Sequence, residues 1–204
     1  MTASAILPGS AIAGILLAAG RGRRFDPLGQ RNKLLQPIDG EPVVVRSARH
    51  LLAALPRVVA VVRDDAEGAQ LGAQLAALGC EVALCEEADS GMAASLVHGL
   101  RHAADASGWV VALGDMPRVR PATIAALAGA VEAGADIAVP VHGNEHGTQR
   151  GNPVAFSRRH LPQLLALTGD RGARGIVKDN IVNEVAVDDP GILLDIDTPP
   201  DLLQ

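Results

Sequence analysis

Aromatic residues are nearly missing from this sequence. They make up 1% of its 204 residues, with two phenylalanines, one tryptophan and no tyrosine. A chain with so few rings lacks the stacking platforms that single-stranded nucleic-acid binders use. Hydrophobic residues still make up 48% of the chain, so the core must be built from Ala, Val, Leu and Ile. Small aliphatic side chains of this kind suit helices that lie closely on a parallel sheet.

An excess of positive charge is missing as well. The formal net charge is -5 at pH 7, which argues against a nucleic-acid partner. Some of the 18 basic residues form a local cluster, at Arg21, Arg23, Arg24, Arg31 and Lys33. A small anionic ligand explains such a local cluster better than a polymer does.

Cysteine is scarce, and the two thiols are Cys80 and Cys85. Both fall in one expected strand, which places them about 16 Å apart and on opposite faces of the sheet. That separation excludes a disulfide between them, because bridged Cα atoms lie within about 7 Å of each other. Two unpaired core thiols are typical of a reducing compartment, so we expect the protein in the cytoplasm.

The apolar stretch from Met1 to Leu17 lacks the features of a membrane segment. It has no basic residue, and Pro8-Gly9 interrupts it. It is too short and broken for a transmembrane helix, and it does not have the charged start of a secretory signal. We expect a loose tail that leads into the first strand, and no membrane partner.

Apolar β-branched runs alternate along the chain with runs rich in Ala and Leu. Strands are predicted at residues 13–18, 57–62, 80–85, 109–113, 136–141, 152–156 and 181–187. Helices are predicted at residues 42–54, 66–78, 89–104, 121–132, 158–167 and 171–180, with a polar hairpin or loop at 142–149. The repeated β-α-β order predicts an α/β domain with helices on both faces of a mostly parallel sheet. The less regular second half is expected to add antiparallel strands.

Particular residues predict three of the helix ends. Pro42 suits the first turn of one helix, because its missing N–H has no partner there. Asp89 or Ser90 is expected to cap the start of a later helix. Gly79 is expected to end the helix before it in a left-handed conformation.

A loop of small residues and cations follows the first strand, from Leu17 through Gly20 to Arg24 and Lys33. Backbone N–H groups in such a loop can form a concavity for anions, and small side chains let phosphates approach closely. Arg24 and Lys33 could then neutralise a triphosphate. A Walker A sequence is missing, and Phe25 stands where a dinucleotide fingerprint needs its third glycine. Composition alone also allows a surface loop with solvated arginines.

Two acidic motifs come at the ends of predicted strands. Asp115 lies between Gly114 and Met116-Pro117, and ligands of open α/β sheets bind outside the carboxyl ends of strands. Such a carboxylate is suited to Mg²⁺, which takes one or two protein carboxylates plus phosphate oxygens. Asp195 and Asp197 alternate with an apolar residue, so they share a strand face or a strand end. Each motif has a structural alternative, a turn cap for Asp115 and a cap of the last helix for Asp197 or Thr198.

Two histidines and a serine are further candidates for site residues. His142 and His146 have the i,i+4 spacing of helical zinc ligands, but glycines beside them indicate a loop. Ser95 has no neighbouring pattern that would make it a nucleophile.

Six motifs occur along nearly the whole chain in a fixed order. They are Leu17-Ala-Ala-Gly20 with Arg24 and Lys33, Gly91-Met-Ala-Ala-Ser95, Gly114-Asp-Met-Pro117, Arg150-Gly-Asn-Pro153, Gly169-Asp-Arg-Gly-Ala-Arg174 and Asp195-Ile-Asp-Thr-Pro199. The ordered set resembles the MobA-like NTP transferases, and within them the molybdenum cofactor cytidylyltransferases. The sequence departs from that family in a longer loop between Arg24 and Lys33, and in Asn152 where relatives commonly have His.

The resemblance implies a Rossmann-like three-layer nucleotidyltransferase fold in a single domain, residues 1–204. Its nucleotide-binding half would span about 13–118, and its acceptor-binding half, with the antiparallel extension, about 119–204. It implies CTP as donor, Mg²⁺ as cofactor, a pterin phosphate as acceptor and a molybdenum hydroxylase among the partners. Ala19, where guanylyl-transferring relatives have Gly, favours CTP.

The resemblance also assigns roles to residues. The residues that would bind nucleotide are Leu17, Ala18, Ala19, Gly20, Arg24, Lys33, Ser95 and Asp115. Lys33, Arg24 and Asp115 would be catalytic, and Asp115 and Asp197 would hold the metal, with Asp195 as the alternative to Asp197. The expected reaction is a direct in-line displacement without a covalent enzyme intermediate.

Two other functions fit the same residues. The acceptor could be a sugar phosphate, methylerythritol phosphate or phospholactate. The protein could instead be a non-catalytic nucleotide-binding chaperone for hydroxylase maturation. The joint presence of Lys33, Asp115 and Asp197 favours an enzyme, because a binder needs fewer charged groups.

Overall fold

The computed structural model describes residues 11–144 and 147–203. In this part of the chain the main sheet has eight strands in the order β10-β7-β9-β6-β1-β4-β5, with β8 paired to β7. These strands are β1 (Ile12–Leu17), β4 (Val58–Arg63), β5 (Glu81–Cys85), β6 (Gly108–Leu113), β7 (Ile137–Asn144), β8 (Gly147–Arg150), β9 (Val154–Ser157) and β10 (Asn183–Ala186). A small second sheet pairs β2 (Pro37–Ile38) with β3 (Glu41–Pro42).

Most neighbouring strands of the main sheet are parallel. β1 pairs in parallel with β4 and β6, β4 with β5, and β7 with β10. β9 runs antiparallel to both β6 and β7, and β8 folds back on β7 as a hairpin. The predicted α/β class, with a mostly parallel sheet and an antiparallel addition in the second half, is confirmed.

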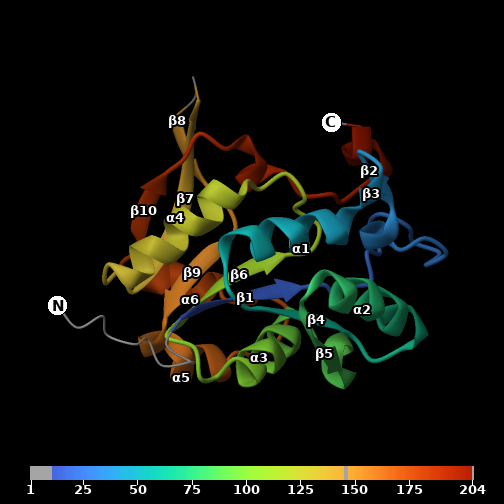
Figure 1. Cartoon of the computed structure of the whole chain (residues 1–204), viewed down its shortest axis with the longest axis horizontal. Coiled ribbons are helices and arrows are strands. Elements are labelled where there is room, and N and C mark those ends of the chain that lie inside the picture. The colour runs from blue at the N-terminus through green and yellow to red at the C-terminus, as the bar shows by residue number, and fades with distance from the viewer. Residues whose placement is uncertain (1–10, 145–146, 204) are drawn as a thin grey trace.

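Helices cover both faces of the sheet and make three layers (Figure 1). They are α1 (Val43–Ala54), α2 (Ala66–Leu78), α3 (Met92–His102), α4 (Pro121–Glu132), α5 (Leu161–Leu165) and α6 (Arg174–Asp179). Helices α1, α2 and α4 pack on one core, and α3, α5 and α6 pack on another. Strand β1 serves both, because Ile12 and Leu16 point into the first core and Ala13 and Ile15 into the second.

The two cysteines also lie on opposite faces of the sheet, Cys85 at the end of β5 and Cys80 directly before this strand. Cys80 is buried in the first core and Cys85 in the second, and both thiols are free. The predicted placement on opposite faces is therefore confirmed. Burial raises the pKa of Cys80 to about 11, so this thiol stays protonated at neutral pH.

Two helix starts differ from the prediction, whereas one helix end agrees with it. Gly79 ends α2 in the left-handed conformation, with φ of 106°. Pro42 belongs to β3 and precedes α1, whose first residue is Val43. The expected Asp89 or Ser90 cap is wrong, because both residues lie in a 3₁₀ turn, Glu86–Ser90, and α3 begins only after Gly91. Asp89 contacts arginines instead, as described below.

The structure describes one of the two histidines that have the spacing of helical zinc ligands. His142 lies in strand β7, where successive side chains do not share a helical face, and its ring contacts the carbonyl of Val187. His146 lies outside the described residues. No helix within residues 11–144 and 147–203 has the length and apolar character needed to cross a bilayer.

Candidate active site

Three chain segments meet where β1 and β6 end. The Gly114 N–H donates to the Leu17 carbonyl at 2.9 Å, and a Cβ at Gly114 would lie only 3.1 Å from that oxygen. The N–H of Ile196 donates to the carbonyl of Asp115 at 2.9 Å. Backbone hydrogen bonds thus bring the small-residue loop, Asp115 and the Asp195–Asp197 segment together.

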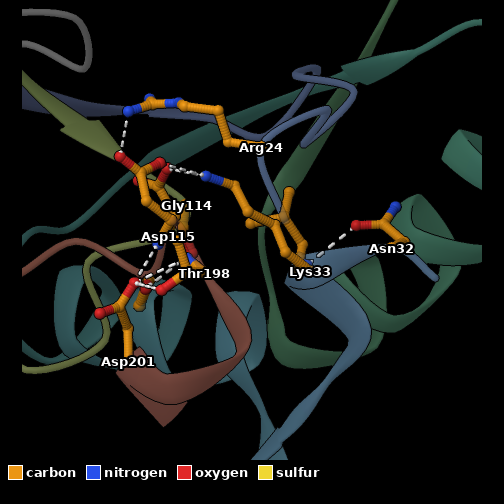
Figure 2. A network of polar contacts seen from close by, with 10 residues as sticks. Arg24, Asn32, Lys33, Gly114, Asp115, Thr198 and Asp201 are labelled. Carbon is orange, nitrogen blue, oxygen red and sulfur yellow. Dashed lines mark hydrogen bonds and ion pairs between the residues drawn. The ribbon is translucent and has the colours of Figure 1, made fainter. Parts of the chain in front are cut away.

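Lys33 joins the two acidic motifs. Its Nζ donates to Asp115 Oδ2 at 2.6 Å and to Asp197 Oδ1 at 3.4 Å (Figure 2). Lys33 opens a 3₁₀ turn that Asn32 caps, since the Asn32 side chain accepts from the Leu34 N–H. The Lys33 side chain is 11% exposed, so this ion pair is largely shielded from water.

Arg24 contacts the same carboxylate from the solvent side. Its Nη1 pairs with Asp197 Oδ2, the oxygen that Lys33 does not contact. The Arg24 side chain is 76% exposed, so it can leave this partner at little cost.

A short 3₁₀ helix, Pro199–Leu203, follows the carboxy-terminal motif, with Thr198 directly before it and Pro199 at its first position as predicted. The Asp201 carboxylate accepts hydrogen bonds from the N–H groups of Asp197 and Thr198 and from the Thr198 hydroxyl. Asp201 therefore caps the turn, and the Asp197 side chain is left to face Lys33 and Arg24 (Figure 2).

Asp115 and Asp195 have the properties of carboxylates that lie close to other carboxylates and are partly shielded from water. Asp115 Oδ1 is buried and has no hydrogen-bond partner among the residues that the structure describes. Partial burial raises the pKa of Asp195, and the nearby charges of Asp197 and Asp115 raise it further. The described residues contain no group of three or more His, Cys, Asp or Glu side chains arranged to hold a metal. A cation here would need ligands from a bound substrate beside the protein carboxylates.

A cleft of about 500 Å³, which we call the main cleft, contains most of the predicted residues. Those that line it are Leu17, Ala19, Gly20, Arg24, Lys33, Ser95, Asp115 and Asp197. Ala18 is buried in the first core and does not line the cleft. Ser95 lies at the inner wall, where its side chain is buried and hydrogen-bonded to the thiol of Cys85.

An ion-pair cluster at the cleft wall was missed by the sequence analysis. Asp89 accepts two hydrogen bonds from Arg21, at 2.7 and 2.6 Å, and one from Arg63 at 2.9 Å. These arginines hold the pKa of Asp89 well below its usual range. Local sequence carries no signal for the cluster, because Arg21 follows β1, Arg63 ends β4 and Asp89 follows β5. Only the folded sheet brings these strands together.

A second cavity of about 320 Å³, which we call the side cavity, adjoins the main cleft. Leu17, Met92 and Leu113 line both spaces. The rest of the side cavity combines apolar side chains from β7 and β9 with polar groups, namely Arg150, Asn152, Arg171 and Arg174. The main cleft is lined by the last residues of β1, β4 and β6. The side cavity also reaches β1 and β6 and extends to β7, β8 and β9.

The fold and this site define an enzyme class, the nucleotidyltransferases. Residues 14–185 match the MobA-like NTP transferase domain. The chain belongs to that family.

Three known proteins are similar over nearly the whole chain. The purine catabolism protein PucB of Bacillus subtilis (strain 168) is 31% identical, covering 91% of each chain. Rv0371c from Mycobacterium tuberculosis H37Rv is 31% identical with a TM-score of 0.79, covering 94% of this chain and 95% of that one. A second structure of Rv0371c, a complex with manganese, has a TM-score of 0.74 at 30% identity, covering 94% and 96%. A nucleotidyl transferase from Methanothermobacter (Mth528) has a TM-score of 0.76 at 25% identity, covering 95% and 94%.

Proposed function

We propose that this nucleotidyltransferase moves CMP from CTP to the phosphate of a molybdopterin-type acceptor and releases pyrophosphate. One observation carries the proposal. The contact of Lys33 with Asp115 and Asp197 lies in the main cleft, and Leu17 and Leu113 beside it open onto the side cavity. Two adjoining spaces with a charged centre next to their junction suit a reaction between two substrates.

In the proposed reaction an oxygen of the acceptor phosphate forms a bond to the α-phosphorus of CTP. The bond from that phosphorus to the bridging oxygen breaks, and pyrophosphate leaves with the electron pair. No side chain forms a covalent intermediate. Lys33 and Arg24 bind the triphosphate and stabilise the charge that develops on the leaving group.

Asp115 and Asp197 would hold Mg²⁺. The unpartnered, buried oxygen of Asp115 and the two-carboxylate donor set fit an ion that takes its remaining ligands from phosphate and water. When bound, the ion would supply positive charge to the reacting phosphate. One structure of the similar protein Rv0371c is a complex with manganese, which supports a divalent cation as cofactor of this chain.

The side cavity supports an anionic acceptor with a flat, partly apolar body. Arg150, Arg171 and Arg174 can bind phosphate, while Val139 and Phe156 offer apolar surface. We therefore assign the nucleotide to residues of about 13–118 and the acceptor mainly to those of about 119–204. Sugar phosphates, methylerythritol phosphate and phospholactate remain the alternative acceptors, and a non-catalytic maturation chaperone the alternative function. In the cell we place the protein in the cytoplasm, where a molybdenum hydroxylase would receive the product.

Pyrophosphate release tests the proposal directly. Purified protein is incubated with Mg²⁺, each of the four NTPs in turn, and each candidate acceptor. We expect release only with CTP and the pterin phosphate, and none after chelation of the metal. Release with another acceptor would correct the substrate, and nucleotide binding without release in any combination would favour the chaperone.

A further inference from the structure

The carboxylates of Asp115 and Asp197 are already occupied by the protein's own cations. Lys33 contacts one oxygen of each, and Arg24 contacts the second oxygen of Asp197 (Figure 2). The remaining oxygen, Asp115 Oδ1, is buried and has no partner in the described part of the chain. In this state a divalent cation and the Lys33 ammonium would compete for the same oxygens.

We propose that Lys33 acts as a placeholder for the metal. In the nucleotide-free protein its ammonium excludes Mg²⁺, and the metal enters only together with the triphosphate. The triphosphate draws Lys33 away from the carboxylates and offers it a new anionic partner. This inference rests on the proposed function in one respect, since it takes Asp115 and Asp197 as the metal ligands.

The energetics favour entry of the metal together with the triphosphate over entry of the metal alone. Mg²⁺ gives up its water reluctantly, and it would have to displace an ammonium that is already shielded from water. Displaced without a substitute partner, Lys33 would be a buried charge without compensation, which is strongly unfavourable. A bound triphosphate removes this penalty and adds oxygen ligands for the metal.

The geometry lets Lys33 move between the two roles. Its flexible four-carbon stem can redirect a compact charge. The stem packs against Gly22, which has φ of 61°, and a Cβ there would lie 3.2 Å from Lys33 Cγ. Because this residue is a glycine, there is room beside the side chain of Lys33. Gly22 and Lys33 both line the main cleft.

The test measures binding of Mn²⁺ alone, so it needs no acceptor and no turnover. Titration calorimetry compares wild type with Lys33→Met, which keeps most of the side-chain volume but removes the charge. Lys178→Met is the matched control, because Lys178 is exposed and outside the cleft. The double variant Lys33→Met/Asp115→Asn tests whether Mn²⁺ binds at Asp115. If Lys33→Met does not fold, Lys33→Gln replaces it as the variant without the lysine charge.

We expect nucleotide-free wild type and Lys178→Met to bind Mn²⁺ weakly, and Lys33→Met to bind it about tenfold more tightly or better. Arg24→Met should have a smaller effect, because the Arg24 side chain is 76% exposed and its ion pair here involves Asp197 alone. The double variant should return to weak binding. Equal Mn²⁺ affinity in wild type and both Lys33 variants would overturn the placeholder role.

Failure of the proposed function would look different. If no acceptor accepts CMP but loss of the Lys33 charge still tightens Mn²⁺ binding, the placeholder stands and the reaction is wrong. If CMP transfer is found but Mn²⁺ binds wild type tightly without nucleotide, the reaction stands and the placeholder is wrong.

Discussion

Arg21 and Asp89 form a two-point ion pair, with Nε–Oδ1 and Nη2–Oδ2 distances of 2.7 and 2.6 Å. Arg63 donates to the same carboxylate at 2.9 Å, so Asp89 links the turn after β5 to the loop after β1 and to the last residue of β4. All three side chains line the main cleft. The ion pairs of this cluster therefore join three chain segments along one part of the cleft lining.

This cluster predicts a dependence of stability on acidic pH. The arginines lower the pKa of Asp89 in the folded state, so its contribution is complete above the ordinary carboxyl pKa, near 4. It is lost progressively as the pH falls below that value. We expect the stability difference between wild type and Asp89→Asn, measured by urea unfolding from pH 6 to pH 3, to shrink toward the acid end. A constant difference over that range would show that the ion pairs are not linked to folding.

Lys33→Ala should lower turnover by about 10²–10³ while the fold is retained, because one preorganised charge at a developing anion is lost. The measurement is steady-state pyrophosphate release, with circular dichroism as the check on folding. Lys178→Ala is the control for loss of one positive charge and should behave as wild type. Near-normal turnover in folded Lys33→Ala would remove this lysine from the reaction.

Asp115→Asn and Asp197→Asn should each lower metal-dependent turnover by about a hundredfold or more, since losing even an outer-shell partner of a metal costs about 10- to 100-fold. The amide keeps the shape but removes the charge. Asp136→Asn is the control, because Asp136 is paired with Arg159 and lies outside the main cleft.

Asp195→Asn should be milder, because Asp197 rather than Asp195 contacts Lys33 and Arg24. Activity in Asp197→Asn combined with inactivity in Asp195→Asn would reverse the assignment of the second metal ligand. Activity in both would leave the segment with a structural role alone.

Ala19→Gly should relax the choice of nucleobase. Ala19 lines the main cleft, and its methyl narrows the space for a two-ring base and restricts the backbone relative to Gly. One methyl should be worth about 1–3 kcal/mol, or roughly 10- to 200-fold in specificity. We expect kcat/KM for GTP relative to CTP to rise in the variant. A wild-type preference for GTP would refute the CTP assignment, whereas an unchanged CTP preference in Ala19→Gly would refute only the role of the methyl.

The sequence by itself determined the order and type of the main elements. Helix and strand differ in the spacing of apolar residues, and this spacing is local. Helix α2, for example, is bounded by Ala66 and by Gly79 as the pattern predicts. The ordered motifs also identified the family, because their small and charged residues are recognisable wherever the chain folds them.

The tertiary structure alone decided which side chains meet. Lys33 and Asp115 are 82 residues apart, and only the adjacent positions of β1 and β6 bring them to 2.6 Å. Asp89 was expected to cap a helix, but two arginines from neighbouring strand ends bind it instead. Strand β9 lies between β6 and β7, and the side cavity is lined by residues of all three strands together with Arg174 of α6. Such contacts depend on the order of the strands in the sheet and on competition between charges that lie far apart in the sequence. A short segment of sequence does not contain this information.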